Sequence, residues 1–82
     1  MLHQFLWDFE PEGNVEHIAE HGLTPDDVEN AFDDILKETI SRSSGWPAIY
    51  GLTLDGRVIF VVYEEIDDGL IYVHTAFEPQ ES

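Results

Sequence analysis

His17 and His21 carry the clearest potential for chemistry in this sequence. They begin and end an H-x-x-E-H pattern. On a helix, this spacing puts both imidazoles on one face, and some zinc peptidases use the pattern with the glutamate as a base. Such a site needs a third protein ligand, and nothing in the sequence brings His3 or His74 close. We therefore predict no metal and no cofactor, and keep a metal-dependent hydrolase as an alternative.

Other motifs for catalysis are missing from the sequence. It has no cysteine, no G-x-S-x-G nucleophile motif, no phosphate-binding loop and no dinucleotide fingerprint. Neighbouring acidic residues are common, but runs of this kind usually form a solvated surface. The remaining candidates are single residues: an imidazole, a carboxylate and the few cations.

The charge of the chain restricts its partners. Eighteen Asp and Glu stand against three Lys and Arg, which gives a net charge of -15 at pH 7. The permanent cations are Lys37, Arg42 and Arg57. Nucleic-acid affinity comes largely from cations that displace counterions, so we expect most of this surface to repel RNA and DNA. The excess of acidic residues is explained either by a general need, namely solubility or adaptation to high salt, or by a specific function. That function would be binding of a basic partner or mimicry of a nucleic acid.

Length and composition indicate one folded domain over residues 1–82. The 43% hydrophobic and 12% aromatic content is typical of a globular chain of this size. No apolar run approaches the roughly 20 residues of a membrane helix, and the N-terminus lacks the basic region of a secretory signal. We expect a soluble, cytoplasmic protein.

The first half of the chain predicts one strand and two short helices. Residues 2–7 form the strand. Asn14 is expected to cap a helix of about two turns that ends at Gly22. Thr24 then caps a second helix, with Pro25 in its first position, acids in its first turn and apolar residues at helical spacing.

The second half reads as strands. Residues 36–43 alternate weakly, residues 48–54 form the next strand, and Asp55-Gly56 predicts a type I′ hairpin turn. Residues 58–63 are apolar without alternation, which predicts a central strand covered on both faces. Residues 70–77 form the last strand. The predicted fold is α+β, ordered β-α-α-β-β-β, with two short helices packed on one face of an antiparallel sheet.

The ordered set of these residues resembles the BrnT family of type II toxin–antitoxin toxins, which are small ribonucleases with a RelE-like fold. The resemblance covers nearly the whole chain. It rests on Trp7-Asp8, Asn14, His17, His21-Gly22, Thr24 to Val28, Arg42, Gly51, Asp55-Gly56-Arg57, Val58 to Glu64 and Thr75-Ala76.

This resemblance implies a metal-independent ribonuclease in which the ribose 2′-hydroxyl attacks the adjacent phosphate. His21 or Glu64 would be the base, and Arg42 and Arg57 would offset charge in the transition state. Where such toxins usually carry a basic residue after the Thr-Ala step, this chain has Phe77. Weak or lost activity and weak RNA binding are therefore expected. The resemblance itself implies an antitoxin as partner.

The rival interpretation is a non-enzymatic, acidic interaction module on the same fold. Such a module would bind a basic protein partner. An exposed strand at either edge of the sheet would also permit a homodimer.

Overall fold

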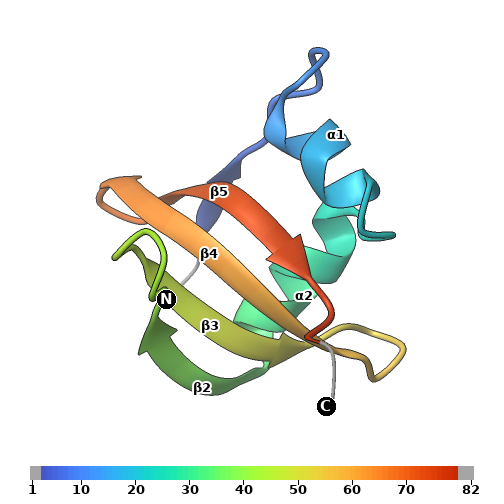
Figure 1. The fold of residues 1–82 in the computed structure, drawn as a ribbon, viewed down its shortest axis with the longest axis vertical. Coiled ribbons are helices and arrows are strands. Elements are labelled where there is room, and N and C mark those ends of the chain that lie inside the picture. The colour runs from blue at the N-terminus through green and yellow to red at the C-terminus, as the bar shows by residue number, and fades with distance from the viewer. Residues whose placement is uncertain (1–2, 80–82) are drawn as a thin grey trace.

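The computed structural model describes residues 3–79, which form a five-stranded sheet and two helices (Figure 1). Along the chain, the elements are β1 (Gln4–Leu6), α1 (Asn14–Ala19), α2 (Pro25–Asp33), β2 (Ile35–Ile40), β3 (Pro47–Leu52), β4 (Val58–Asp67) and β5 (Leu70–Phe77). The strands lie in the order β1-β5-β4-β3-β2. Within residues 3–79, no helix is long and apolar enough to span a membrane.

The predicted α+β fold, with two short helices against one side of a sheet, is confirmed. Two details differ from the prediction. Four strands follow the helices, in agreement with the four predicted segments, whereas the predicted order β-α-α-β-β-β counts only three. In addition, β1 pairs with β5 in parallel, so the sheet is mixed. Leu2, which was assigned to the first strand, lies outside the described residues.

The corner between the helices follows the predicted end signals. Gly22 has a φ of +79°, which favours glycine, and its N–H donates to the carbonyl of Ala19. The N–H of Leu23 reaches back to the carbonyl of Ile18, which completes a Schellman motif. Thr24 and Asp27 then form the two reciprocal hydrogen bonds of a capping box.

Asn14 is not the helix cap that the sequence predicted. Gly13 occupies that position, and Asn14 is the first residue of α1 with a buried side chain. Its amide accepts a hydrogen bond from the N–H of Asp8 at 2.8 Å and donates to the carbonyls of Leu6 and Val73. The side chain therefore ties α1 to β5 and to the end of β1.

The hydrophobic core fills the space between the helices and one face of the sheet. Its fully buried side chains come from both layers: Ile18, Leu23, Val28 and Ala31 from the helical layer, and Ile49, Ile59, Val61, Ile71, Val73 and Ala76 from the strands. In Figure 1, α2 passes behind the strands and α1 lies beside β5, so no helix packs on the other face of β4, which we call the open face. The prediction that residues 58–63 are covered on both faces is wrong for Val58, which is exposed, and for Phe60, which is only half-buried, whereas Val62 on the same face is buried.

The turn between β3 and β4 also differs from its prediction. Gly56 has a φ of +86°, whereas Asp55 does not have the positive φ that a type I′ turn requires. The N–H of Gly56 donates to the carbonyl of Thr53 at 3.0 Å. The result is a longer loop in which only the glycine adopts the left-handed conformation.

Candidate functional site

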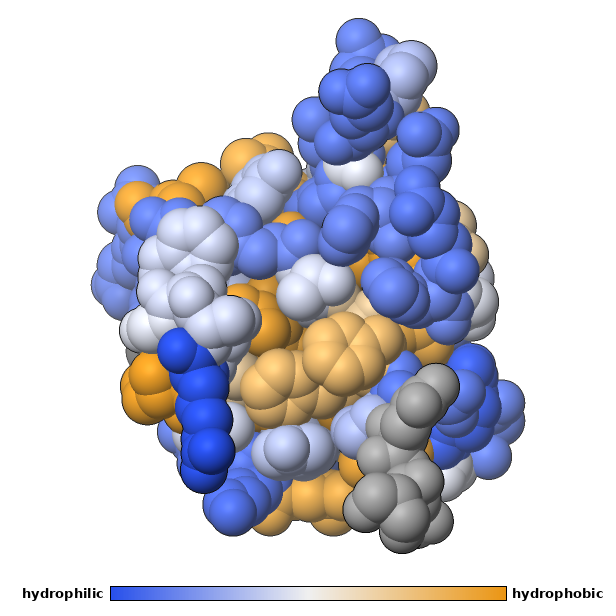
Figure 2. All heavy atoms as spheres, viewed as in Figure 1, coloured by the Kyte–Doolittle hydropathy of each residue, from blue (hydrophilic) through white to orange (hydrophobic). Residues whose placement is uncertain are grey.

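The uncovered face of the sheet contains a hollow of about 460 Å³. It lies between β2, the following turn and the middle strands, and its lining residues are Lys37, Thr39, Ile40, Ser41, Arg42, Ser43, Tyr50 and Phe60. Figure 2 shows hydrophobic side chains in the centre of this face with hydrophilic ones around them. The hollow therefore combines cations, hydroxyl groups and aromatic rings.

Lys37 and Arg42 have no ionic partner in the described part of the chain. Every ion pair found among residues 3–79 involves Arg57 or His74 instead. Two of the three permanent cations of an acidic protein thus share one hollow without a neutralising carboxylate. This is the part of the surface best suited to an anion.

A series of aromatic rings runs from the hollow to the pair of histidines. The ring centroids of Tyr50 and Phe60 lie 4.8 Å apart, and those of Phe60 and Phe77 lie 5.5 Å apart. Phe77 is 6.0 Å from the ring of His21, which is 5.7 Å from that of His17. We call these five side chains the aromatic track.

The histidine pair sits where α1 meets β5. His17 Nε2 is 3.1 Å from the Thr75 hydroxyl, so this ring is held by the strand. Neither ring has a further histidine or carboxylate suited to a metal, because no group of three or more such residues gathers within residues 3–79. The H-x-x-E-H spacing therefore places two imidazoles side by side without building a metal centre from the described residues.

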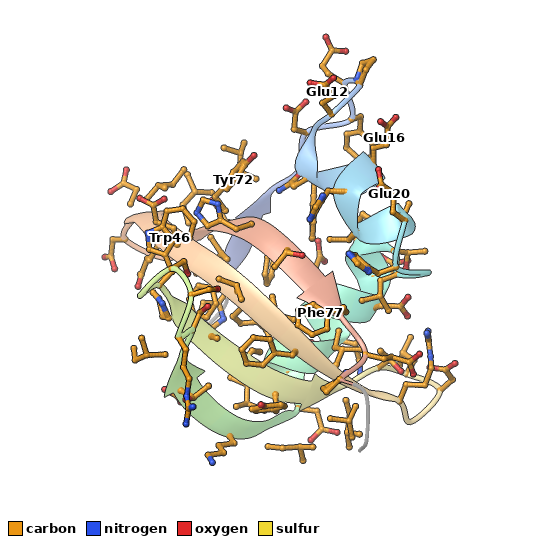
Figure 3. All side chains as sticks on the ribbon, viewed as in Figure 1. Glu12, Glu16, Glu20, Trp46, Tyr72 and Phe77 are labelled. Carbon is orange, nitrogen blue, oxygen red and sulfur yellow. The ribbon has the colours of Figure 1, made fainter. Side chains whose placement is uncertain are left out.

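Glu64 lies on the same open face but in a separate cluster. Its carboxylate is 3.1 Å from His74 Nε2. The His74 ring stacks on Trp46, with 3.6 Å between centroids, and meets Tyr72 edge-on. Figure 3 shows Trp46 and Tyr72 at one end of the face and Phe77 towards the other. Glu64 is thus engaged by an imidazole.

Arg57 lies at the opposite end of β3 from Arg42. It precedes Val58, whereas Arg42 follows the strand end where Ile40 pairs with Pro47. Its guanidinium donates to the Asp55 carboxylate at 3.0 Å and to Asp27 at 3.4 Å. The hydrogen bond to Asp55 is the main cause that raises the pKa of Arg57. Arg57 is therefore a neutralised residue of the hairpin.

The four predicted site residues do not converge on one point. His21 and Arg42 stand at the two ends of the aromatic track and its hollow, while Arg57 is paired with acids and Glu64 contacts His74. The prediction missed the contributions of Lys37 and of the rings on the open face. Tyr50, Phe60 and Phe77 have buried neighbours in the structure, but residues 58–63 show no alternation in the sequence, so only the fold shows that these rings share one face.

Comparisons with protein-family models, with curated proteins and with solved structures found no match to this chain.

Proposed function

We propose that the chain is a BrnT-like, toxin-family ribonuclease of weak activity. In this proposal, single-stranded RNA binds to the open face of the sheet. The observation that supports this proposal is the aromatic track between His21 and the hollow that holds Lys37 and Arg42. Unstacked bases pair well with aromatic side chains, and cations bind the phosphates between them.

The proposed reaction takes place at the histidine end of the track. His21 accepts the proton of a ribose 2′-hydroxyl, whose oxygen forms a bond to the adjacent phosphorus. The bond from phosphorus to the 5′-oxygen breaks, and this oxygen takes a proton from water. The products are a 2′,3′-cyclic phosphate and a 5′-hydroxyl end. No permanent cation is assigned to the reacting phosphate, so we expect cleavage to be slow.

Arg42 has a different role in this proposal. Several aromatic rings separate it from His21, so it binds a phosphate further along the same strand and not the reacting one. Its loss should therefore raise KM more than it lowers kcat. Glu64 and Arg57 are assigned no part in the reaction, because Arg57 is held in an ion pair and Glu64 is in hydrogen-bond contact with His74.

The test is cleavage of a labelled single-stranded RNA by purified protein, with and without EDTA. We expect slow, EDTA-resistant cleavage that His21→Ala abolishes, that Arg42→Gln weakens through KM, and that the control Arg57→Gln leaves unchanged. Cleavage by the parent protein no faster than by His21→Ala would end the nuclease proposal. Unaffected growth of a bacterial host at high expression would count against a toxin.

A second candidate function is an acidic module that binds a basic protein, such as an antitoxin. Its support is that Glu12, Glu16 and Glu20 are exposed just before, within and just after α1, together with the neutralisation of Arg57 (Figure 3). The test is binding of a lysine-rich peptide at low salt. Binding that Glu16→Gln and Glu20→Gln weaken would favour this function, and an unchanged affinity would oppose it.

A further inference from the structure

We propose that the hollow on the open face is a binding site for a nucleotide with a terminal phosphate. The phosphate would lie between Lys37 and Arg42, and the base would lie on Tyr50 and Phe60. The inference rests on the proposed function, because it specifies which part of an RNA chain this face prefers. It can be tested without cleavage, since a mononucleotide contains no internal phosphodiester bond.

The charge of the hollow favours a terminal phosphate over an internal one. An internal phosphodiester carries one negative charge, whereas a phosphate monoester carries about 1.5 to 2 at pH 7. Lys37 and Arg42 supply two positive charges, and no carboxylate within residues 3–79 is paired with either. Repulsion by the net charge of -15 makes an unspecific anion a poor ligand elsewhere on the surface.

The hollow also offers hydrogen-bond donors on a fixed backbone. Thr39, Ser41 and Ser43 line it alongside the two cations. The N–H of Ser41 donates to the carbonyl of Trp46 at 2.8 Å, and that of Gly45 donates to the carbonyl of Ser41 at 2.8 Å. These bonds hold the turn that carries Arg42. Charged donors with nearby hydroxyls are the usual surroundings of a bound phosphate.

The aromatic wall favours a base over a free phosphate ion. Tyr50 and Phe60 lie side by side on neighbouring strands, with their rings tilted by 52°. A base that stacks on an aromatic side chain gains affinity that a free phosphate ion cannot gain. The volume of about 460 Å³ suits a small molecule, for which pockets span roughly 300–1,000 Å³.

The experiment is calorimetric titration of the intact chain at low salt with adenosine 3′-monophosphate, adenosine and inorganic phosphate. We expect the nucleotide to bind at least about tenfold more tightly than either fragment. Arg42→Gln and Lys37→Gln should each weaken nucleotide binding by about tenfold. Tyr50→Leu should weaken nucleotide binding and leave phosphate binding unchanged. Circular dichroism establishes that each variant is folded.

The third cation provides the matched control. Arg57→Gln removes the same charge outside the hollow, so it should leave nucleotide affinity unchanged. Equal binding of adenosine and the nucleotide would overturn the role of the phosphate. Equal binding of inorganic phosphate would overturn the role of the rings. An equal loss in Arg57→Gln would show that only net charge matters. Nucleotide binding without RNA cleavage would refute the nuclease alone, and cleavage without nucleotide binding would refute this site alone.

Discussion

The indole of Trp46 lies flat against the imidazole of His74, with 3.6 Å between the ring centroids and 12° between the ring planes. The same imidazole contacts Glu64 at 3.1 Å. Trp46 ends the turn that carries Arg42, while His74 and Glu64 belong to β5 and β4. The His74 imidazole thus connects the turn beside the hollow with strands β4 and β5 in the middle of the sheet.

This stack should appear as a coupling between the two residues in unfolding experiments. Trp46→Ala and His74→Ala each remove one ring, so the double variant should lose less stability than the two single variants together. The expected coupling is about 0.5–1.5 kcal/mol, as for other aromatic pairs. Urea denaturation of the four proteins measures it. Additive effects would mean that the stacked geometry contributes nothing to stability.

Asn14 should be among the most sensitive polar positions. Asn14→Ala leaves the N–H of Asp8 and the carbonyls of Leu6 and Val73 without their partner in a buried place. We expect a loss of roughly 2–3 kcal/mol in the free energy of unfolding. Asn14→Asp retains an acceptor but loses both donors, so it should also destabilise. Asn14→Ala within 0.5 kcal/mol of the parent would contradict this role.

The contrast between Asn14 and Thr24 shows which contacts can be predicted from the sequence and which cannot. Thr24 forms its capping box with Asp27, only three residues away, so a local pattern was sufficient to predict it. Asn14 follows a glycine and resembles a cap, but its partners include Val73. Such long-range contacts leave no local signal. The parallel pairing of β1 with β5 was missed for the same reason.

Gly51 should not tolerate a side chain, because α2 crosses β3 at this point. A Cβ atom built there would lie 2.3 Å from the carbonyl oxygen of Ala31 and 2.8 Å from its Cβ. Gly51→Ala should therefore cost about 1–3 kcal/mol through overpacking, measured by thermal or urea unfolding. Ala31→Gly should not restore stability, since the carbonyl remains in place. Full rescue by Ala31→Gly would contradict the backbone contact.

The candidate site was predictable only in part. Counting charges identifies Arg42, Arg57 and Lys37, but sequence alone does not show which of them acids neutralise. Arg57 has an acid two residues away and a second one on α2, and the fold brings both into contact. The open face itself follows from where the helices pack. An uninterrupted apolar sequence does not distinguish a strand that is covered on one face from a strand that is covered on both.

Asp55 should make the hairpin sensitive to acid. Its pKa is lowered from the ordinary 3.8, first by the hydrogen bond from the Thr53 hydroxyl and then by that from Arg57. A lowered pKa in the folded state stabilises the protein above the ordinary value, and this contribution is lost as the pH falls through the lowered value. Asp55→Asn should therefore destabilise at pH 6, and its difference from the parent should shrink below pH 3.8. Unfolding measured across this range checks it, and a difference independent of pH would contradict it.

Repulsion between the acidic residues Glu16 and Glu20 should destabilise the protein at low salt, and added salt should remove this destabilisation. Glu16 lies in α1 and Glu20 is its C-cap residue with helical backbone angles, so these two like charges are one turn apart and repel. Glu20→Lys replaces this repulsion with an attraction, so it should stabilise the protein by about 0.5 kcal/mol at low salt. The gain should fall towards zero in 1 M NaCl, where the screening length is about 3 Å. Glu20→Gln is the matched control and should give a smaller gain, because it removes the repulsion without adding the attraction. A gain that persists in 1 M NaCl would have to come from helix propensity or packing, and the repulsion along α1 would then be too small to matter.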